Sequence, residues 1–191
     1  MPKKAASVEI QNVVASATLK QKLDLISIVK MFPGVEYKPE QFPGLVYRLK
    51  KPKTATLIFS SGKMVCTGAR SDRQAKRAVM KVVDELKATG IVILGSPDIK
   101  IQNIVASGDL NGKIDLEGCV QSLERTMYEP EQFPGLIYRM VDPKVVLLLF
   151  ASGKFVCTGA QNEDQVYEAV KKLQEALEAK QLISYPEQTP S

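Results

Sequence analysis

The sequence repeats itself once, at a spacing of 91 residues and without an insertion or deletion between the two copies. Of the 60 aligned positions that start at Ile10 and end at Ala69, 33 carry the identical residue in the second copy. The run Glu40–Leu45 returns unchanged as Glu131–Leu136. Two segments this similar are expected to fold alike and to pack about a pseudo-twofold axis. A surface that they build together suits a roughly twofold target, and duplex DNA is such a target.

Composition is that of an ordinary globular protein, with 191 residues and 45% hydrophobic content. No apolar run approaches the roughly 20 residues that span a bilayer, and Met1–Ser7 lacks a secretory apolar segment, so we expect an intracellular protein. Cys66 and Cys157 occupy equivalent positions, Cys119 stands alone, and no C-x-x-C pair is present. We interpret all three as buried, reduced thiols.

The net charge of +5 is divided unevenly along the chain. Residues 1–95 hold 17 Lys and Arg against 7 Asp and Glu, whereas residues 96–191 hold 9 against 14. The basic half suits a polyanion, and the acidic half has carboxylates to offer to a second partner. The alternative explanation is that solvated helix faces simply differ in sign.

Each repeat is predicted to run β-α-β-β-β-β-α. In the first copy we expect a strand over 7–16, a helix over 19–32, a short strand ending at Pro39, and strands over 45–49, 54–59 and 63–67. A closing helix begins in each copy with a capping box, Ser71-x-x-Gln74 and Asn162-x-x-Gln165. Its apolar stripe faces the sheet, and consists of Ala75, Val79, Val82 and Leu86 in the first copy and Val166, Val170, Leu173 and Leu177 in the second.

The strands do not alternate between apolar and polar residues as a sheet with one wet face would. In Val145–Phe150 the odd-numbered and the even-numbered positions, which point to opposite faces of a strand, are all apolar. Val65 and Thr67 lie on the face opposite Met64 and Cys66. If the helices cover one face, a second apolar face is left over, and such a face marks a binding surface. The alternative is a longer sheet covered on both sides, but the helices in this order can cover only one.

The residue types of this second face favour one target. Its middle is Val, Leu, Thr and Asn, and cations such as Lys63 and Lys154 lie at the strand ends, where they suit phosphates. An apolar centre cannot read the donor and acceptor pattern of the major groove, but it suits the minor groove of A·T-rich DNA. Asn12 and Asn103 would donate amide hydrogens to adenine N3 or thymine O2. The valines would exclude the amino group of guanine.

Two pairs of repeated segments closely resemble the TATA-box-binding protein family, and because little exists beyond the duplicated core, the archaeal members in particular. They are Phe-Pro-Gly-Leu-x-Tyr-Arg at 42–48 and 133–139, and Ser-Gly-Lys-x-Val-Cys-Thr-Gly-Ala at 61–69 and 152–160. The resemblance covers about Val8 to Ala179 and implies an α+β fold, in which two pseudo-symmetric repeats form a saddle with a curved antiparallel ten-stranded sheet and four helices on its convex face. The implied organisation is a flexible 1–7, repeats over 8–97 and 98–181 in one structural unit, and a flexible tail over 182–191.

The resemblance also implies a role for individual residues. DNA-intercalating wedges fall on Phe42, Phe59, Phe133 and Phe150. Base contacts fall on Asn12, Asn103, Val14, Val105, Val65, Val156, Thr67 and Thr158. Phosphate contacts fall on Arg48, Lys53, Ser61, Lys63, Arg139, Lys144, Ser152 and Lys154. A phenylalanine at a hairpin turn, where a polar residue would be soluble, is independent reason to expect a partner there.

The implied partners are the double-stranded DNA of a TATA box, transcription factor B and, indirectly, RNA polymerase, with no cofactor, metal or membrane. The turn that contains Glu129, Glu131 and Gln132 resembles the family's docking site for transcription factor B, and Lys38 replaces Glu129 in the first repeat. An archaeal member would act in the cytoplasm on the nucleoid. The C-terminus, which ends in residues 185–191 with a single acid, departs from the acidic tail of some archaeal relatives.

Two other classes of protein fit these residues less well. An enzyme would need a nucleophile, an acid/base pair or a metal site, and the chain has no His and no Gly-rich phosphate loop. Carboxylates shared by the repeats are scattered, as in Asp24/Asp115 and Glu40/Glu131. The stronger alternative is a protein-interaction module that binds a polypeptide on the second apolar face. Such a module would show no binding to A·T-rich DNA.

Overall fold

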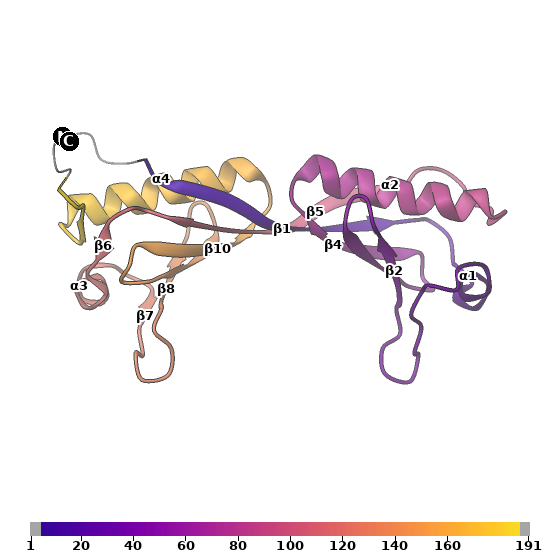
Figure 1. Ribbon diagram of the computed structural model, residues 1–191, viewed down its shortest axis with the longest axis horizontal. Coiled ribbons are helices and arrows are strands. Elements are labelled where there is room, and N and C mark those ends of the chain that lie inside the picture. The colour runs from indigo at the N-terminus through magenta and orange to yellow at the C-terminus, as the bar shows by residue number, and fades with distance from the viewer. Residues whose placement is uncertain (1–4, 188–191) are drawn as a thin grey trace. The chain divides into compact units, whose positions relative to one another are not determined.

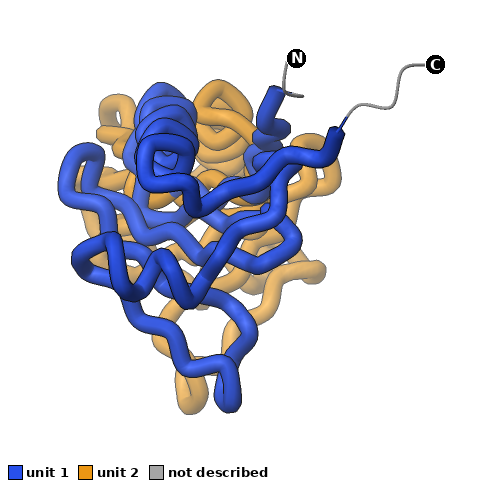
Figure 2. Tube along the Cα trace, turned by 90° about the vertical axis from the view of Figure 1, so that its left-hand side faces the viewer, with its two compact units in different colours: residues 1–11, 104–191 blue, residues 12–103 orange. Residues whose placement is uncertain are grey.

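The structure is a computed structural model that describes residues 5–187. The chain divides into two compact units, drawn in different colours in Figure 2: unit 1 comprises residues 1–11 and 104–191, and unit 2 comprises residues 12–103. The unit boundaries lie within two long strands, β1 (Ser7–Thr18) and β5 (Asp98–Asp109), each of which contributes to both units. The predicted flexible ends, 1–7 and 182–191, lie partly outside the described residues.

Unit 2 contains an antiparallel sheet in the order β2-β3-β4-β1. Its further elements are α1 (Leu25–Met31), β2 (Leu45–Leu49), β3 (Thr54–Ile58), β4 (Lys63–Ala69) and α2 (Asp72–Ala88). The three hairpin strands lie within a residue or two of their predicted positions, because the turn residues between them mark their ends.

The predicted helix over 19–32 is wrong at its start, because α1 begins only at Leu25. Asp24 caps the helix by accepting hydrogen bonds from the N–H groups of Ile26 and Ser27 at 3.1 and 3.4 Å. The residues before the cap pair with the β3–β4 turn instead, since the Leu19 N–H donates to the Gly62 carbonyl at 3.0 Å. Backbone N–H groups that a longer helix would use are therefore hydrogen-bonded to a distant turn instead.

Unit 1 repeats this sheet in the order β5-β10-β9-β8-β7. Its elements after β5 are β6 (Lys113–Ile114), α3 (Leu116–Ser122), β7 (Thr126–Met127), β8 (Leu136–Met140), β9 (Val145–Leu149), β10 (Lys154–Ala160), α4 (Glu163–Ala179) and β11 (Ile183–Ser184). β6 and β11 form a separate two-stranded sheet. In unit 2 the counterpart of β7 is only the isolated bridge Glu36–Val46, so one of the ten expected strands is reduced to a single pair.

The closing helices α2 and α4 begin as their capping boxes predict. The Ser71 hydroxyl accepts a hydrogen bond from the Gln74 N–H at 3.0 Å, and the Asn162 side chain accepts one from the Gln165 N–H at 2.9 Å. All eight residues of the two apolar stripes are buried. In Figure 1 each helix lies along one face of the sheet of its own unit. The predicted α+β class with antiparallel strands is confirmed, and residues 5–187 contain the four expected helices.

The three cysteines lie in the apolar interior, as the sequence predicts. Each is fully buried, with no exposed surface. Burial raises the pKa of the thiol to about 11 for Cys157 and for Cys119, with a further contribution from Asp115 for the latter. The thiolate form is therefore disfavoured, and these side chains act as small core residues. Within residues 5–187, no helix is both long and apolar enough to cross a bilayer, and no cluster of three potential metal ligands occurs.

Burial alternates along the strands, and among the described residues no helix covers the second face of either sheet. In β4, Met64 and Cys66 are buried under α2, whereas Val65 and Thr67 point to the opposite face and are half-buried. β10 shows the same pattern. The predicted second face therefore exists in both units, and we call it the open face.

Candidate nucleic-acid interface

The centre of the open face is an apolar row that crosses the strands. In unit 2, Val46 lies opposite Leu57, which lies opposite Val65, which in turn lies opposite Ser16. Unit 1 has the row Ile137, Leu148, Val156 and Ser107 in the same register. Directly opposed residues on antiparallel strands are about 5 Å apart at Cβ, so each row is a continuous strip.

Four apolar members of these rows were not among the residues predicted from the sequence: Val46, Leu57, Ile137 and Leu148. All are half-buried and share the open face with Val65 or Val156. The sequence signal that could have identified them is the alternation of side chains along a strand. Leu57 stands two residues before Phe59, and Leu148 two residues before Phe150, so each must share a face with that aromatic residue.

Asn12 is held in a defined orientation on the open face. Its Oδ1 accepts a hydrogen bond from the Gly68 N–H at 2.7 Å, and its Nδ2 donates to the Thr67 hydroxyl at 3.0 Å. Because an amide nitrogen carries two hydrogens, one remains for a further acceptor. Val14 is half-buried beside it on β1. The same residue types, Asn103, Val105 and Thr158, are half-buried at the equivalent positions.

Each unit carries a pair of phenylalanines at the edge of its apolar row. The rings of Phe42 and Phe59 pack edge to face with centroids 5.8 Å apart, and those of Phe133 and Phe150 with centroids 5.9 Å apart. Phe42 and Phe133 are nevertheless 40% and 43% exposed. In Figure 1 the loop that leads into β2, and its counterpart before β8, project away from the helix of their unit. The structure thus brings together the two predicted wedges of each repeat.

A glycine permits each ring pair to close. A Cβ on Gly135 would lie 2.7 Å from Cε1 of Phe133 and 3.0 Å from Cε1 of Phe150. Gly44 has the same surroundings in unit 2. The absence of a side chain, and not an unusual backbone angle, is what this position requires.

Gly135→Ala is therefore expected to separate the rings. An edge-to-face aromatic pair contributes about 1 kcal/mol, so the free energy of unfolding should fall by a similar amount. Urea unfolding measures this change, with Gly34→Ala as the control, because no atom lies within 4 Å of a Cβ built on Gly34. Equal stability of the Gly135→Ala variant and the unmodified protein would show that the rings adjust at no cost.

The predicted phosphate-binding residues are all exposed. They lie around the apolar rows, and are Arg48, Lys53, Ser61 and Lys63 in unit 2 and Arg139, Lys144, Ser152 and Lys154 in unit 1. Arg48 lies opposite Ala55, which lies opposite Thr67, so the cation shares one row across the strands with a predicted base contact. The equivalent row in unit 1 is Arg139, Val146 and Thr158. Cations that flank an apolar strip suit a groove bordered by phosphates.

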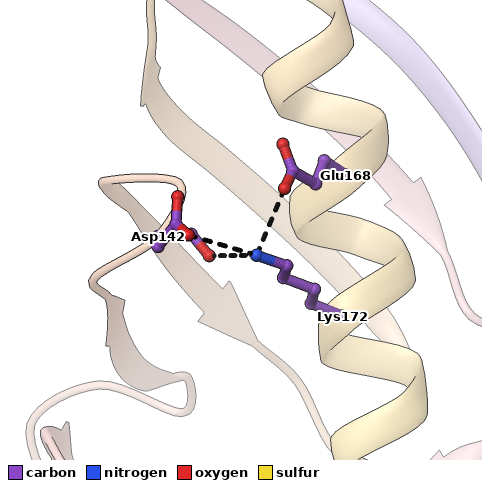
Figure 3. Close-up of polar contacts among 3 residues, drawn as sticks. All are labelled: Asp142, Glu168 and Lys172. Atoms are coloured by element: carbon purple, nitrogen blue, oxygen red, sulfur yellow. Dashed lines mark hydrogen bonds and ion pairs between the residues drawn. The ribbon is translucent and has the colours of Figure 1, made fainter.

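A lysine on the closing helix anchors the loop that carries Lys144. Lys172 donates to the backbone carbonyl of Asp142 at 2.7 Å and lies 3.2 Å from the Glu168 carboxylate and 3.6 Å from that of Asp142, as Figure 3 shows. Glu168, and then Asp142, raise the pKa of Lys172, so the anchor stays charged. In unit 2, Lys81 donates to the Lys51 carbonyl at 2.6 Å and anchors the loop of Lys53 in the same way.

The predicted partner-binding turn is built by its backbone. The Glu129 carbonyl accepts hydrogen bonds from the N–H groups of Gln132 and Phe133 at 3.0 and 2.9 Å. The side chains of Glu129, Glu131 and Gln132 are exposed. Lys38 makes the same backbone turn in unit 2. The two turns therefore share a conformation and differ in charge.

Comparison with known proteins agrees with this arrangement. Residues 7–89 and 98–180 both match the family model described as transcription factor TFIID, or TATA-binding protein. The chain is 58% identical over 176 residues to a TATA-box-binding protein of Pyrodictium occultum, which covers 92% of this chain and 87% of that protein. It is 54% identical over 168 residues to the one of Sulfurisphaera tokodaii, with coverages of 88% and 85%.

A solved structure is similar as well. It is that of Methanococcus jannaschii TBP, with a TM-score of 0.83 and 47% sequence identity, over 91% of this chain and 99% of that chain.

Proposed function

We propose, from the premise that this chain belongs to the TATA-binding protein family, that it is a general transcription factor which binds the minor groove of an A·T-rich TATA box. It is a DNA-binding protein and not an enzyme. Since promoters lie on the chromosome, the protein acts inside the cell, at the nucleoid. Each unit contacts one half of the DNA site.

The duplicated open face is the observation that carries this proposal. The Val, Leu and Ile side chains of its rows offer no acceptor to the exocyclic amino group of guanine, and the second amide hydrogen of Asn12 matches the acceptors of adenine N3 and thymine O2. The Phe pairs at the row edges, each with one exposed ring, provide apolar wedges, which minor-groove proteins insert between base pairs to kink the duplex. We propose that Phe42, Phe59, Phe133 and Phe150 bend the DNA in this way.

A gel-shift assay tests the function directly. An A·T-rich site of about eight base pairs should be retained at protein concentrations at which a G·C-rich duplex of the same length remains free. The alternative function, a protein-interaction module that uses the open face for a polypeptide, requires that neither duplex is bound. Equal binding to both duplexes would contradict minor-groove readout.

Salt dependence tests the phosphate contacts. Each Lys that neutralises a phosphate contributes roughly 0.9 to the slope of log affinity against log salt. Lys63→Ala and Lys154→Ala should each make the slope shallower, by up to about one unit. Lys87→Ala is the control, since this exposed lysine lies in the last turn of α2, away from the open face. Unchanged slopes in both test variants would place the phosphate contacts elsewhere.

The acidic turn at Glu129 is proposed to bind transcription factor B, which in turn recruits RNA polymerase. The support is the difference between the two otherwise identical turns, because Glu129 replaces Lys38 at the same backbone position. A basic surface on the partner would bind the turn of unit 1 and be repelled by that of unit 2.

A further inference from the structure

One row of the open face differs in charge between the two units. In unit 2, Lys63 of β4 lies directly opposite Thr18 of β1. In unit 1, the equivalent Lys154 of β10 lies directly opposite Asp109 of β5. A carboxylate therefore stands beside the phosphate-binding lysine of unit 1, where unit 2 has a neutral hydroxyl.

The next strand of unit 2 adds a second cation. Gln102 of β5 donates to the Ser16 hydroxyl of β1 at 2.7 Å, which places these two residues side by side on neighbouring strands. Antiparallel partners run in opposite directions, so Lys100 comes opposite Thr18 two residues further along. The row in unit 2 thus consists of Lys63, Thr18 and Lys100, and both lysines are exposed.

The next strand of unit 1 adds a second carboxylate. Gln11 of β1 donates to the Ser107 hydroxyl of β5 at 2.9 Å, so Glu9 comes opposite Asp109 by the same rule. Glu9, Asp109 and Lys154 line one hollow of about 850 Å³, together with Phe150, Ser152 and Val156. The Asn111 N–H donates to Asp109 Oδ1 at 2.8 Å and holds this carboxylate at the end of β5. Two acids therefore stand beside one predicted wedge.

We propose that the two units hold the DNA phosphates unequally: the Lys63 row of unit 2 is the strong anchor, and Asp109 with Glu9 weakens the contact at the Lys154 row of unit 1. This inference rests on the proposed function. A carboxylate next to a lysine competes with a phosphate for that lysine and repels the phosphate. The consequence is a preferred orientation on any site whose two ends differ in backbone charge, and a release of DNA that starts at unit 1.

The test uses a palindromic A·T site in which the phosphates at one end are replaced by neutral methylphosphonates. Base readout is then equal in both orientations, and only the backbone charge differs. A cleavage probe tethered to a cysteine introduced at Val141, an exposed residue between β8 and β9, reports which end of the site unit 1 occupies. The unmodified protein should bind with unit 2 on the fully charged end of the site. A preference of roughly threefold is expected, because a few partly exposed charge contacts provide about this much.

Two variants make the ends equal by using residues that the other repeat already has. Glu9→Lys with Asp109→Thr gives both ends the unit 2 row, and should raise affinity and abolish the preference. Thr18→Asp with Lys100→Glu gives both ends the unit 1 row, and should lower affinity and also abolish the preference. Glu175→Lys with Asp164→Thr makes the same charge change on the exposed surface of α4 and should keep the preference.

The outcomes separate this inference from the function itself. Failure of the unmodified protein to prefer A·T-rich over G·C-rich DNA would overturn the proposed function. Normal A·T preference with equal orientations on the half-neutral site would overturn only the unequal anchors. A preference that survives in both symmetrised variants would also overturn them, because the orientation would then come from other residues.

Discussion

DNA bound to a Phe133→Ala variant is expected to bend markedly less than DNA bound to the unmodified protein. The Phe133 ring is 43% exposed although it packs on Phe150, so apolar surface is available for insertion between base pairs. Removal of the ring should cost on the order of 1–3 kcal/mol in affinity, by analogy with base–aromatic stacking. Fluorescence transfer between dyes at the two DNA ends measures the bend. Phe42→Ala is expected to act in the same way in unit 2.

Phe32→Leu is the matched control for both variants. Its ring packs against that of Tyr47 within unit 2, with the ring centroids 5.2 Å apart, and the second repeat carries Leu123 at the equivalent position. Its replacement should leave the bend unchanged. A normal bend in both Phe42→Ala and Phe133→Ala would refute the assignment of the exposed rings as wedges.

Glu129→Arg combined with Glu131→Arg is expected to abolish the ternary complex with transcription factor B and leave DNA binding intact or slightly tighter. Both side chains are exposed on a turn formed by the Glu129 carbonyl, so their replacement changes charge without removing the backbone hydrogen bonds. Reversal of two charges in a polar contact turns attraction into repulsion, and the added positive charge favours DNA. Gel shifts with and without the partner separate the two effects.

Glu40→Arg supplies the control, because Glu40 is the repeat equivalent of Glu131 and carries the same charge change to the other turn. The Glu40→Arg variant should form the ternary complex normally, and Glu131→Arg alone should weaken it. On a near-palindromic A·T site with all phosphates intact, a tethered cleavage probe should show mixed orientations for the protein alone and a single one with the partner. A single orientation without any partner would contradict a directing role for the Glu129 turn.

Local features of the fold were predictable from the sequence because their causes lie within a few residues. The capping boxes at Ser71 and Asn162 start α2 and α4 because the groups that bond there are three residues apart. The parity of Val65 and Thr67 placed them opposite the helix because strand side chains alternate. Phe42 and Phe133 were assigned from the family resemblance, with independent support from the expectation that a hairpin turn favours a polar residue, and both rings are exposed.

The pairing between strands was decided only by the tertiary structure. Leu57 lies opposite Val65, and Asp109 lies opposite Lys154. Hydrogen bonds between separate strands set this register, and no single segment of the sequence specifies it. α1 starts at Leu25 because the preceding backbone is bonded to a hairpin turn about 40 residues away in the chain. The sequence by itself thus determined the duplicated α+β plan and the kind of surface. The tertiary structure determined which side chains meet on that surface, because register and side-chain orientation depend on partners distant in sequence, as Asn12 and Gly68 show.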